Sequence, residues 1–450
     1  MQAMKDSGIE WIGEIPEEWE KYKIKYIVSL PVTDGPHATP QLIEEGIPFI
    51  SAEAVKKNRI NFDLKRGYIS LEDHLLFCKK CKPQKEDIFI VKSGATTGEI
   101  AYVDTDEEFS VWSPLALVRS KKDYFVQRFI FYVILSDYFR KQIELKWNYG
   151  TQQNIGMNVI ENLFLLCPPM YVQQRIADYL DQKCAEIDSI ISAKQRQNEL
   201  LKQQRQSVIY EAVTGKRAII NAECIMHNEN RKMKDTGIEW IGGIPEDWGV
   251  SKLKYLAKKP MQYGANETGE DFNEELPRYI RITDISLNNE LKDDYKLSLP
   301  YAKAQEYILK EGDILFARSG ATAGKSFYYK REYGTACFAG YLIRFTTDPQ
   351  KALSEFIYYY TLSNAYNEWA SMIFIQATIQ NISAEKYANL TIPLPSLKEQ
   401  RIIADYLDQK CKGINNIINS NNSVIKKLKE YRQSIIYEAV TGKLTIEASS

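Results

Sequence analysis

Two glycine-rich turns contain the side chains that could contact a phosphate group. Their sequences are SGATTG in the first half of the chain and SGATAGKS in the second half. A nucleotide-binding P-loop has four residues between its glycines and then Gly-Lys-Ser or Gly-Lys-Thr. Gly320 and Gly324 enclose only three residues, and Glu99 stands where the second segment has Lys325. This excludes a nucleotide site. It leaves either a tight turn after a strand or a turn whose N–H and hydroxyl groups contact nucleic-acid phosphate, aided by the basic residue before it.

Cysteine and carboxylate patterns argue against catalysis. Cys78 and Cys81 form a lone CxxC, whereas a zinc site normally needs a second ligand pair, so we interpret them as surface thiols. Asp87 and Asp313 precede the two turns, but a nuclease-type cluster needs a further acidic residue and a nearby lysine. The sequence CPPM around Pro168 lacks the amide and the aromatic residue of an adenine-methyltransferase loop. We predict no catalytic residue, no metal site and no cofactor in this chain.

Length and composition predict a folded protein of two or three domains. The chain has 450 residues, of which 44% are hydrophobic and 26% charged, and these values exclude a largely disordered protein. No apolar run reaches the roughly 18 residues of a membrane span, and we expect no secretory signal. Seven cysteines, an odd number, fit free thiols in a reducing cytoplasm. The net charge of -1 means that any nucleic-acid-binding surface must be local.

The chain is a tandem duplication. MKDSGIEWIGEIPEEW begins at Met4, and MKDTGIEWIGGIPEDW begins at Met233. EAVTGK begins at Glu211 and again at Glu438. A repeat of about half the chain is too long for a solenoid unit, so each copy must fold as a larger body. No histidine recurs at the matching place of the other copy, and the three are His37, His74 and His227.

Each copy begins with a globular part that mixes strands and turns. Short runs rich in β-branched and aromatic residues predict strands, among them Ile24 to Leu30, Asp87 to Val91 and Leu115 to Val118. One helix is predicted over Phe129 to Phe139 and is repeated over Phe356 to Tyr366. The two globular parts differ most between their first strand and the glycine-rich turn, which suggests that each recognises something different.

A long helix follows each globular part. Residues 171 to 213 contain no Gly and no Pro, and apolar residues recur at steps of three and four, which predicts a coiled-coil seam. Gly215 and Gly442 are placed like the glycines that end helices. Asn198 lies at a seam position and could fix the register or simply be tolerated there. Some 40 residues make a rod of roughly 60 Å. The seam residues are Leu180, Ile187, Ile191, Leu201, Leu407, Ile414, Ile418 and Leu428.

A helix with one apolar stripe needs a partner, and the nearest partner is its duplicate. An antiparallel pairing would hold two similar but non-identical domains at a fixed separation. The predicted fold class is α+β, with two duplicated mixed domains joined by two long antiparallel coiled-coil helices. The predicted segments are a first domain 1–170, a first helix 171–216, a linker 217–232, a second domain 233–395 and a second helix 396–443.

The motifs GIEWIGEIPEEW, SGATTG and SGATAG, QQRIADYLDQK and EAVTGK resemble the specificity (S) subunit of Type I restriction–modification systems over nearly the whole chain. The resemblance implies two target recognition domains that read an asymmetric bipartite DNA sequence, with the helices as spacer, in a phage-defence system. It implies a non-catalytic subunit that docks two modification subunits, which bind S-adenosylmethionine and methylate adenine. Motor/nuclease subunits that use ATP and Mg would join for cleavage.

The resemblance and the residue types together indicate where DNA would bind. Asn and Gln can pair with adenine, and Thr can meet a thymine methyl group. Asn154 and Asn381 are identical in the two copies, which fits phosphate contact or loop structure better than sequence reading. The predicted DNA-binding residues are Asp34, Gly35, His37, Thr39, Lys92, Ser93, Gly94, Thr96, Thr97, Gln152, Gln153 and Asn154 in the first copy, and Gln262, Tyr263, Asn266, Arg318, Ser319, Gly320, Thr322, Lys325, Gln380 and Asn381 in the second.

The rod length predicts a gap within the DNA site. Sixty ångströms span on the order of 18 base pairs, so two half-sites would be separated by about 5 to 8 unspecified bases. A rival hypothesis is a coiled-coil scaffold whose 29 tyrosines include protein-binding patches and which has no DNA affinity. A self-sufficient methyltransferase would instead bind S-adenosylmethionine by itself.

Overall fold

The computed structural model describes residues 3–146, 154–220, 223–224, 231–286, 289–375 and 381–446. Contacts divide the chain into two compact units: Met1–Lys194 with Asn422–Ser450 (unit 1), and Gln195–Asn421 (unit 2). Both boundaries fall inside the long helices. Each unit therefore consists of one globular domain and part of both helices, whereas the predicted segments treated domains and helices as separate bodies.

The globular domain of unit 1 is built on two sheets. One has the order β4-β12-β9-β10-β7-β6, and the other has the order β11-β5-β8. The central strands β9 and β12 of the first sheet are buried along their whole length, so both faces of that sheet are covered there. The strands are β4 (Thr33–Asp34), β5 (Ile47–Ile50), β6 (Val55–Lys56), β7 (Arg59–Ile60), β8 (Gly67–Ile69), β9 (Ile88–Val91), β10 (Ile100–Tyr102), β11 (Ser110–Val111) and β12 (Leu115–Val118).

The domain of unit 2 repeats these two sheets but has different strands at their edges. Its sheets have the orders β19-β26-β23-β24 and β20-β22-β21-β25. Among the described residues, the β6–β7 hairpin extends the first sheet only in unit 1, and β20 extends the second sheet only in unit 2. The strands are β19 (Gln262–Tyr263), β20 (Glu270–Asp271), β21 (Arg278–Ile280), β22 (Leu297–Ser298), β23 (Ile314–Ala317), β24 (Ser326–Tyr328), β25 (Ala336–Phe338) and β26 (Leu342–Phe345).

Helices cover the sheet in each unit, and the prediction of one continuous helix in each copy is wrong. The single helix predicted over Phe129 to Phe139 is broken into α3 (Gln127–Leu135) and α4 (Asp137–Leu145). The break lies at Ser136, whose hydroxyl donates to the Val133 carbonyl at 2.6 Å and so satisfies the end of α3. The copy in unit 2 is broken in the same way, into α9 (Ser354–Thr361) and α10 (Asn364–Ile375).

The run Ile24 to Leu30, predicted as a strand, begins with the helical turn α1 (Ile24–Ile27). Ile24 and Ile27 are both fully buried, and one helical turn places residues three apart on the same face. The matching turn in unit 2 is α7 (Leu253–Leu256). Strand pairs flank these turns: β3 (Glu20–Lys23) with β13 (Phe164–Cys167), and β18 (Gly249–Lys252) with β27 (Thr391–Leu394).

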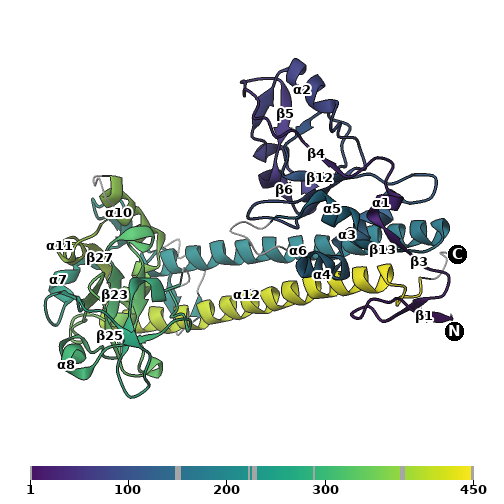
Figure 1. Ribbon diagram of the computed structural model, residues 1–450. Coiled ribbons are helices and arrows are strands. Elements are labelled where there is room, and N and C mark those ends of the chain that lie inside the picture. The colour runs from purple at the N-terminus through teal and green to yellow at the C-terminus, as the bar shows by residue number, and fades with distance from the viewer. Residues whose placement is uncertain are drawn as a thin grey trace. The chain divides into compact units, whose positions relative to one another are not determined.

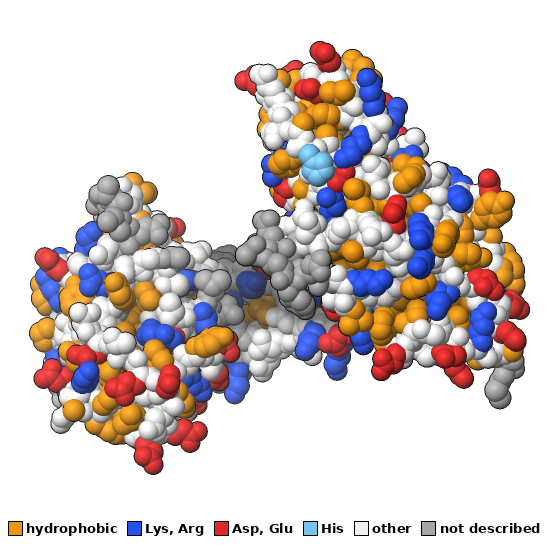
Figure 2. Space-filling view, viewed as in Figure 1, with side chains coloured by type: hydrophobic (Ala, Val, Ile, Leu, Met, Phe, Trp, Pro, Cys, Tyr) orange, Lys and Arg blue, Asp and Glu red, His pale blue; other side chains and the backbone are white. Residues whose placement is uncertain are grey.

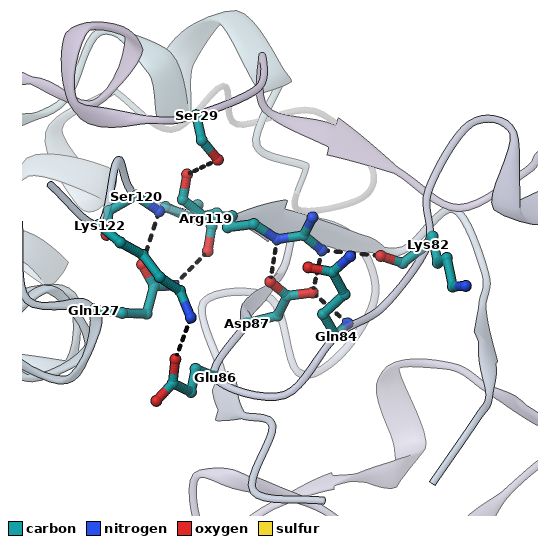
Figure 3. Close-up of polar contacts among 10 residues, drawn as sticks. Ser29, Lys82, Gln84, Glu86, Asp87, Arg119, Ser120, Lys122 and Gln127 are labelled. Atoms are coloured by element: carbon teal, nitrogen blue, oxygen red, sulfur yellow. Dashed lines mark hydrogen bonds and ion pairs between the residues drawn. The ribbon is translucent and has the colours of Figure 1, made fainter. Parts of the chain in front are cut away.

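The aspartates that precede the two glycine-rich turns serve the frame. The carboxylate of Asp87 accepts hydrogen bonds from Arg119 Nε at 2.6 Å and from the backbone N–H of Gln84 at 2.7 Å (Figure 3). Asp313 takes the same place in unit 2, where the Thr346 hydroxyl donates to it at 2.6 Å. Burial raises the pKa of Asp87 although Arg119 acts in the opposite direction. These carboxylates fix the loops that enter β9 and β23.

The two long helices are α6 (Met170–Val213) and α12 (Leu397–Val440), and they run side by side within each unit (Figure 1). In unit 2, Asn421 donates to Asn198 at 2.8 Å, and Arg205 donates to Asn415 at 2.7 Å. The chain number therefore rises along α6 while it falls along α12, which confirms the antiparallel pairing. All eight predicted seam residues are buried or half-buried. The predicted fold class is confirmed.

Both helices end as predicted, and their ends explain two of the repeated motifs. Gly215 and Gly442 have φ of +71° and +73°, a conformation that favours glycine. A Cβ on Gly215 would lie 2.4 Å from Pro245, and one on Gly442 would lie 2.4 Å from Pro16. The repeated IPE motif therefore packs directly on the repeated VTGK motif, and each copy's motif meets the helix end of the other copy.

Two smaller predictions need correction. Ala218 and Ile219, expected in a polar linker, are buried in the core of unit 2, and β14 (Ile219–Ile220) pairs with β15 (Glu223–Cys224). Cys81, expected as a surface thiol, is buried because its side chain faces an apolar cluster under β9, and burial raises its pKa to about 12. Within the described ranges, we find no helix long and apolar enough to cross a membrane.

Candidate nucleic-acid interface

The turn after β9 has an open outer side. Gly94 has a φ of +103°, and a Cβ there would meet nothing within 4 Å. The Thr97 hydroxyl donates to the Gly94 carbonyl at 2.6 Å, which closes the turn. Ser93 and Thr96 are half-buried at its surface. The glycine is required by the backbone conformation and not by crowding, so a ligand could approach this side of the turn.

The turn after β23 repeats this geometry. Gly320 has a φ of +76° and also faces open space. A 3-10 turn spans Gly320–Thr322. Lys325 follows this turn, and its side chain is half-buried. The backbone N–H of Gly324 donates to Ala317 at 3.0 Å, as Gly98 donates to Val91 at 2.8 Å in unit 1. The two copies therefore present the same loop shape with different basic residues.

The predicted asparagines meet these turns. Asn154 forms an antiparallel bridge with Ser93, and Asn381 forms the same bridge with Ser319. These contacts bring together residues about 60 positions apart in the chain. The side-chain oxygen of Asn381 is buried and has no hydrogen-bond partner among the described residues. The other members of this predicted set, Gln152, Gln153 and Gln380, lie outside the described residues.

The loop that begins at β4 is held by a buried ion pair. Asp34 is fully buried, and its carboxylate accepts a hydrogen bond from Lys80 and lies 3.0 Å from Lys92 Nζ. Burial tends to raise the pKa of Asp34, but the two lysines outweigh it and lower the pKa below its ordinary value. A Cβ on Gly35 would lie 2.0 Å from the Val111 carbonyl oxygen, so only glycine fits there. Asp34 and Lys92 thus position the loop, and neither is free to read a base.

Unit 2 holds the corresponding loop by a different contact. The guanidinium carbon of Arg318 lies 5.0 Å from the ring centroid of Tyr263, a cation–π geometry. The Tyr263 hydroxyl accepts the backbone N–H of Ala384 at 3.0 Å. Gln262, predicted to contact DNA, instead accepts a hydrogen bond from the buried Arg344. The Arg318 Nε is buried without a hydrogen-bond partner among the described residues.

Sorting the predicted residues by exposure separates two roles. Asp34, Lys92 and Gln262 are engaged by other side chains of the same unit. The loop residues that remain open to solvent are His37, Thr39 and Asn266. On the face shown in Figure 2, basic and acidic side chains are interspersed over each unit, in keeping with the net charge of -1. The described part of the chain holds no group of three or more His, Cys, Asp or Glu residues arranged for a metal ion.

Sequence reasoning missed several residues that build this site. Lys80 was not singled out, yet it pairs with Asp34 from 46 positions away. Arg119 was not singled out, although its pair with Asp87 orders the strand before the turn. Asn421 was not recognised as the partner of Asn198. No local signal marks such contacts, because each joins segments that are distant in the sequence.

Comparison with known proteins shows the family to which this chain belongs. The model of the Type I restriction modification DNA specificity domain matches residues 16–202 and 245–427, so both copies match separately. The chain therefore belongs to this family, and it is a specificity subunit of a type I restriction–modification system, which recognises a DNA sequence.

Curated relatives agree over most of the chain. The EcoBI specificity subunit of Escherichia coli is 25% identical over 362 residues, which are 77% of this chain and 74% of that one. The MjaVIII specificity subunit of Methanocaldococcus jannaschii is 22% identical over 462 residues, covering 99% and 98% of the two chains. A solved chain described as "Structural basis underlying complex assembly and conformational transition of the type I R-M system" is 16% identical, with a TM-score of 0.68 over 96% of this chain and 99% of that chain. It shares the fold.

Proposed function

We propose that each globular domain reads one half of an asymmetric bipartite DNA site. The proposal rests on the observation that the two domains share one backbone frame but hold different side-chain contacts on it. Both domains present an open glycine turn bridged to an asparagine, but Lys92 pairs with Asp34 in one and Arg318 lies on Tyr263 in the other. A shared frame suits phosphate contacts, which position a protein on DNA, and differing loops suit base contacts, which specify the sequence.

The helices would set the gap between the half-sites. α6 and α12 have 44 residues each, which corresponds to about 66 Å of helix. The buried pair Asn198–Asn421 is a polar contact of the kind that specifies register in a coiled coil, which supports a fixed length. Deleting residues 195–201 together with 418–424 would remove one facing heptad from each helix. The gap should then shorten by about 3 base pairs. An unchanged gap would contradict the spacer role.

The chain would act through partners and perform no chemistry itself. We propose that it docks two modification subunits, which bind S-adenosylmethionine, and motor/nuclease subunits that use ATP and Mg, in the cytoplasm. Ile190 and Ile417 support a docking role, because they hold equivalent places on α6 and α12 and are 47% and 46% exposed. Exposed apolar side chains at matching places on both helices suit two copies of one partner.

Co-expression with the modification subunit and mapping of methylated adenines tests this function. We expect one two-part asymmetric motif with a fixed gap. A catalytically dead modification subunit gives the matched control and should remove the signal. If a soluble complex neither methylates nor binds DNA, the protein-scaffold hypothesis becomes the better one. If the isolated chain binds S-adenosylmethionine, the non-catalytic role is wrong.

A further inference from the structure

An arginine of unit 1 lies in a cage formed by its own unit. The guanidinium carbon of Arg128 is 4.5 Å from the ring centroid of Tyr102, 4.8 Å from that of Phe131 and 5.2 Å from that of Tyr132. Its Nε donates to Oδ1 of Asp181 at 2.7 Å, and the Tyr132 hydroxyl donates to the same oxygen at 2.6 Å. Aromatic faces with a carboxylate at the edge are well suited to the flat, delocalised guanidinium cation.

Unit 2 keeps this cage. Strand register and helix numbering give the counterparts, which are Tyr328, Tyr358, Tyr359 and Asp408. The ring centroids of Tyr328 and Tyr358 are 5.3 Å apart, the same distance as between Tyr102 and Phe131. The Tyr359 hydroxyl donates to the Asp408 carboxylate, as Tyr132 does to Asp181. The aromatic and acidic parts of the cage are therefore preserved.

The built-in cation is not preserved. Arg128 is the second residue of α3, and the second residue of α9 is Glu355. Glu355 is one-third exposed and lies 3.5 Å from the exposed Arg401. A cage that encloses an arginine in one unit thus has a carboxylate in the arginine's place in the other. The charge at this position is reversed, while each surrounding position keeps an aromatic ring.

A cavity of about 580 Å³ opens at the cage in unit 2. That volume lies within the range of small-ligand sites and would admit a guanidinium group with its alkyl stem. Three basic and four acidic side chains line it, and they are Arg205, Lys325, Lys330, Glu290, Glu311, Glu355 and Asp408. The acidic excess favours a cation.

Arg205 does not replace the missing arginine. Its Nη1 donates to Asn415 at 2.7 Å across the helix pair. Unit 1 has the same contact between Arg432 and Asp188, whose Nε and Oδ1 are 3.3 Å apart, and it has Arg128 in addition. Among the described residues, unit 2 therefore has no cation on its rings in the place of Arg128, and Glu355 pairs with Arg401 instead.

We propose that this cavity binds a guanidinium cation supplied from outside the chain. The cation would stack on Tyr328 and Tyr358 and pair with Glu355 and Asp408. Two sources share this chemistry: a free guanidinium compound, or an arginine side chain of a protein that assembles with the chain. The cavity borders the glycine-rich turn of unit 2, because Lys325 lines it, but the guanidinium proposal does not rest on the DNA-reading function proposed above.

Titration calorimetry of the full chain with agmatine tests the site. Putrescine is the matched control, because it has an amine where agmatine has a guanidinium group. We expect one agmatine per chain and binding of putrescine at least about tenfold weaker. Equal affinity for both compounds would overturn the guanidinium assignment. No binding of agmatine up to about 10 mM would overturn the site.

Two reciprocal substitutions locate the binding. Glu355→Arg should fill the cage as Arg128 does in unit 1 and abolish agmatine binding while circular dichroism stays unchanged. Arg128→Glu should open the cage of unit 1 and raise the stoichiometry from one to two. Should that variant fail to fold, Asp408→Asn gives an independent test and should weaken agmatine binding about tenfold. Unchanged binding in Glu355→Arg or in Asp408→Asn would overturn the proposal.

The same titration on the complex with the modification subunit distinguishes the two sources. Loss of the agmatine site on assembly, restored by removal of the subunit, would identify an arginine of that subunit as the occupant. An agmatine site retained in the complex would identify a free guanidinium compound.

Discussion

The two recognition domains hold the same turn with different contacts. In unit 1, Lys92 precedes the turn and pairs with the buried Asp34. In unit 2, Arg318 precedes the turn and lies over Tyr263, which occupies the place of Asp34 in the strand register. An ion pair and a cation–π contact both fix a basic side chain, but they leave different groups at the surface. Duplication has kept the geometry of the site and has changed its chemistry.

The Arg128 cage extends this difference to the helical side of each unit. Unit 1 encloses its own cation between three rings and Asp181, and unit 2 keeps the rings and leaves a cavity. A substitution that acts on the shared backbone frame should therefore have the same effect in both units. A substitution at Arg128 or Glu355 should have a different effect in each.

The largest effect is expected where the frame is the same in both units. Alanine at Gly35 or at Gly264 would place a Cβ 2.0 Å or 2.3 Å from a backbone carbonyl oxygen. Either substitution should cost about 4 kcal/mol of unfolding free energy, measured by hydrogen exchange of the adjacent strands. Gly249→Ala, which has 3.9 Å of room, is the control and should change little. If one unit tolerates its alanine, the two frames are not equivalent.

Arg128→Ala should separate the two units. It removes a guanidinium from three rings and a carboxylate, and we expect a loss of about 2 kcal/mol in the stability of α3. Glu355→Ala should stay within about 0.5 kcal/mol because its ion pair with Arg401 is solvent-exposed. Hydrogen exchange of α3 and α9 peptides gives both values. Equal losses would contradict the account of the cage.

Asn198→Leu should destabilise the helix pair by about 1 to 2 kcal/mol, because it leaves the buried Asn421 without this partner. Replacing both asparagines with leucine should recover most of the loss, since an apolar pair packs well in a seam. Urea unfolding of the single and the double variant measures this, with the exposed Gln203→Ala as control. A double variant as unstable as the single one would show that the pair does more than satisfy its own hydrogen bond.

The smallest effect concerns pH. The pKa of Asp34 is lowered in the folded state, so its ion pair contributes fully above the ordinary value of 3.8 and is lost as the pH falls through the lowered value. Unit 1 should therefore lose more stability than unit 2 below pH about 4, since the cation–π contact that holds the corresponding loop of unit 2 contains no carboxylate. Pulse proteolysis with pepsin, with fragments identified by mass, follows both units. Asp34→Asn should remove the difference, and its persistence would contradict the assignment.

Local patterns predicted much of the frame. The strands at Ile88–Val91 and Leu115–Val118, the helix ends at Gly215 and Gly442, and the seam all follow from periodicity and turn chemistry. A local contact also explains why the single helix predicted over Phe129 to Phe139 is wrong. The Ser136 hydroxyl bonds the backbone at the end of α3, and the apolar pattern of the surrounding residues gives no sign of this break. The duplicated asparagine indicated that Asn154 and Asn381 share one structural place, and the structure shows the place.

What could not be predicted depends on contacts across long stretches of chain. Lys80 reaches Asp34 and Asn421 reaches Asn198 from segments with no local mark of the pairing. The same limit applied to Lys92 and Gln262, whose residue types suit DNA but whose side chains are engaged within the unit. A residue's type indicates the chemistry it could do, and only its neighbours decide whether it is free to do it.

Exchange of one domain tests the central claim, that a common frame carries two separate specificities. Residues 24–163 can be replaced by 253–390, because Ile24 bonds Leu163 at 3.0 Å and Leu253 bonds Leu390 at 3.0 Å, so the graft ends match. Methylated adenines would then be mapped in cells that also express the modification subunit. The account predicts that the first half-site is replaced by a copy of the second, with the gap unchanged. Persistence of the original first half-site, or a change in both halves, would contradict it.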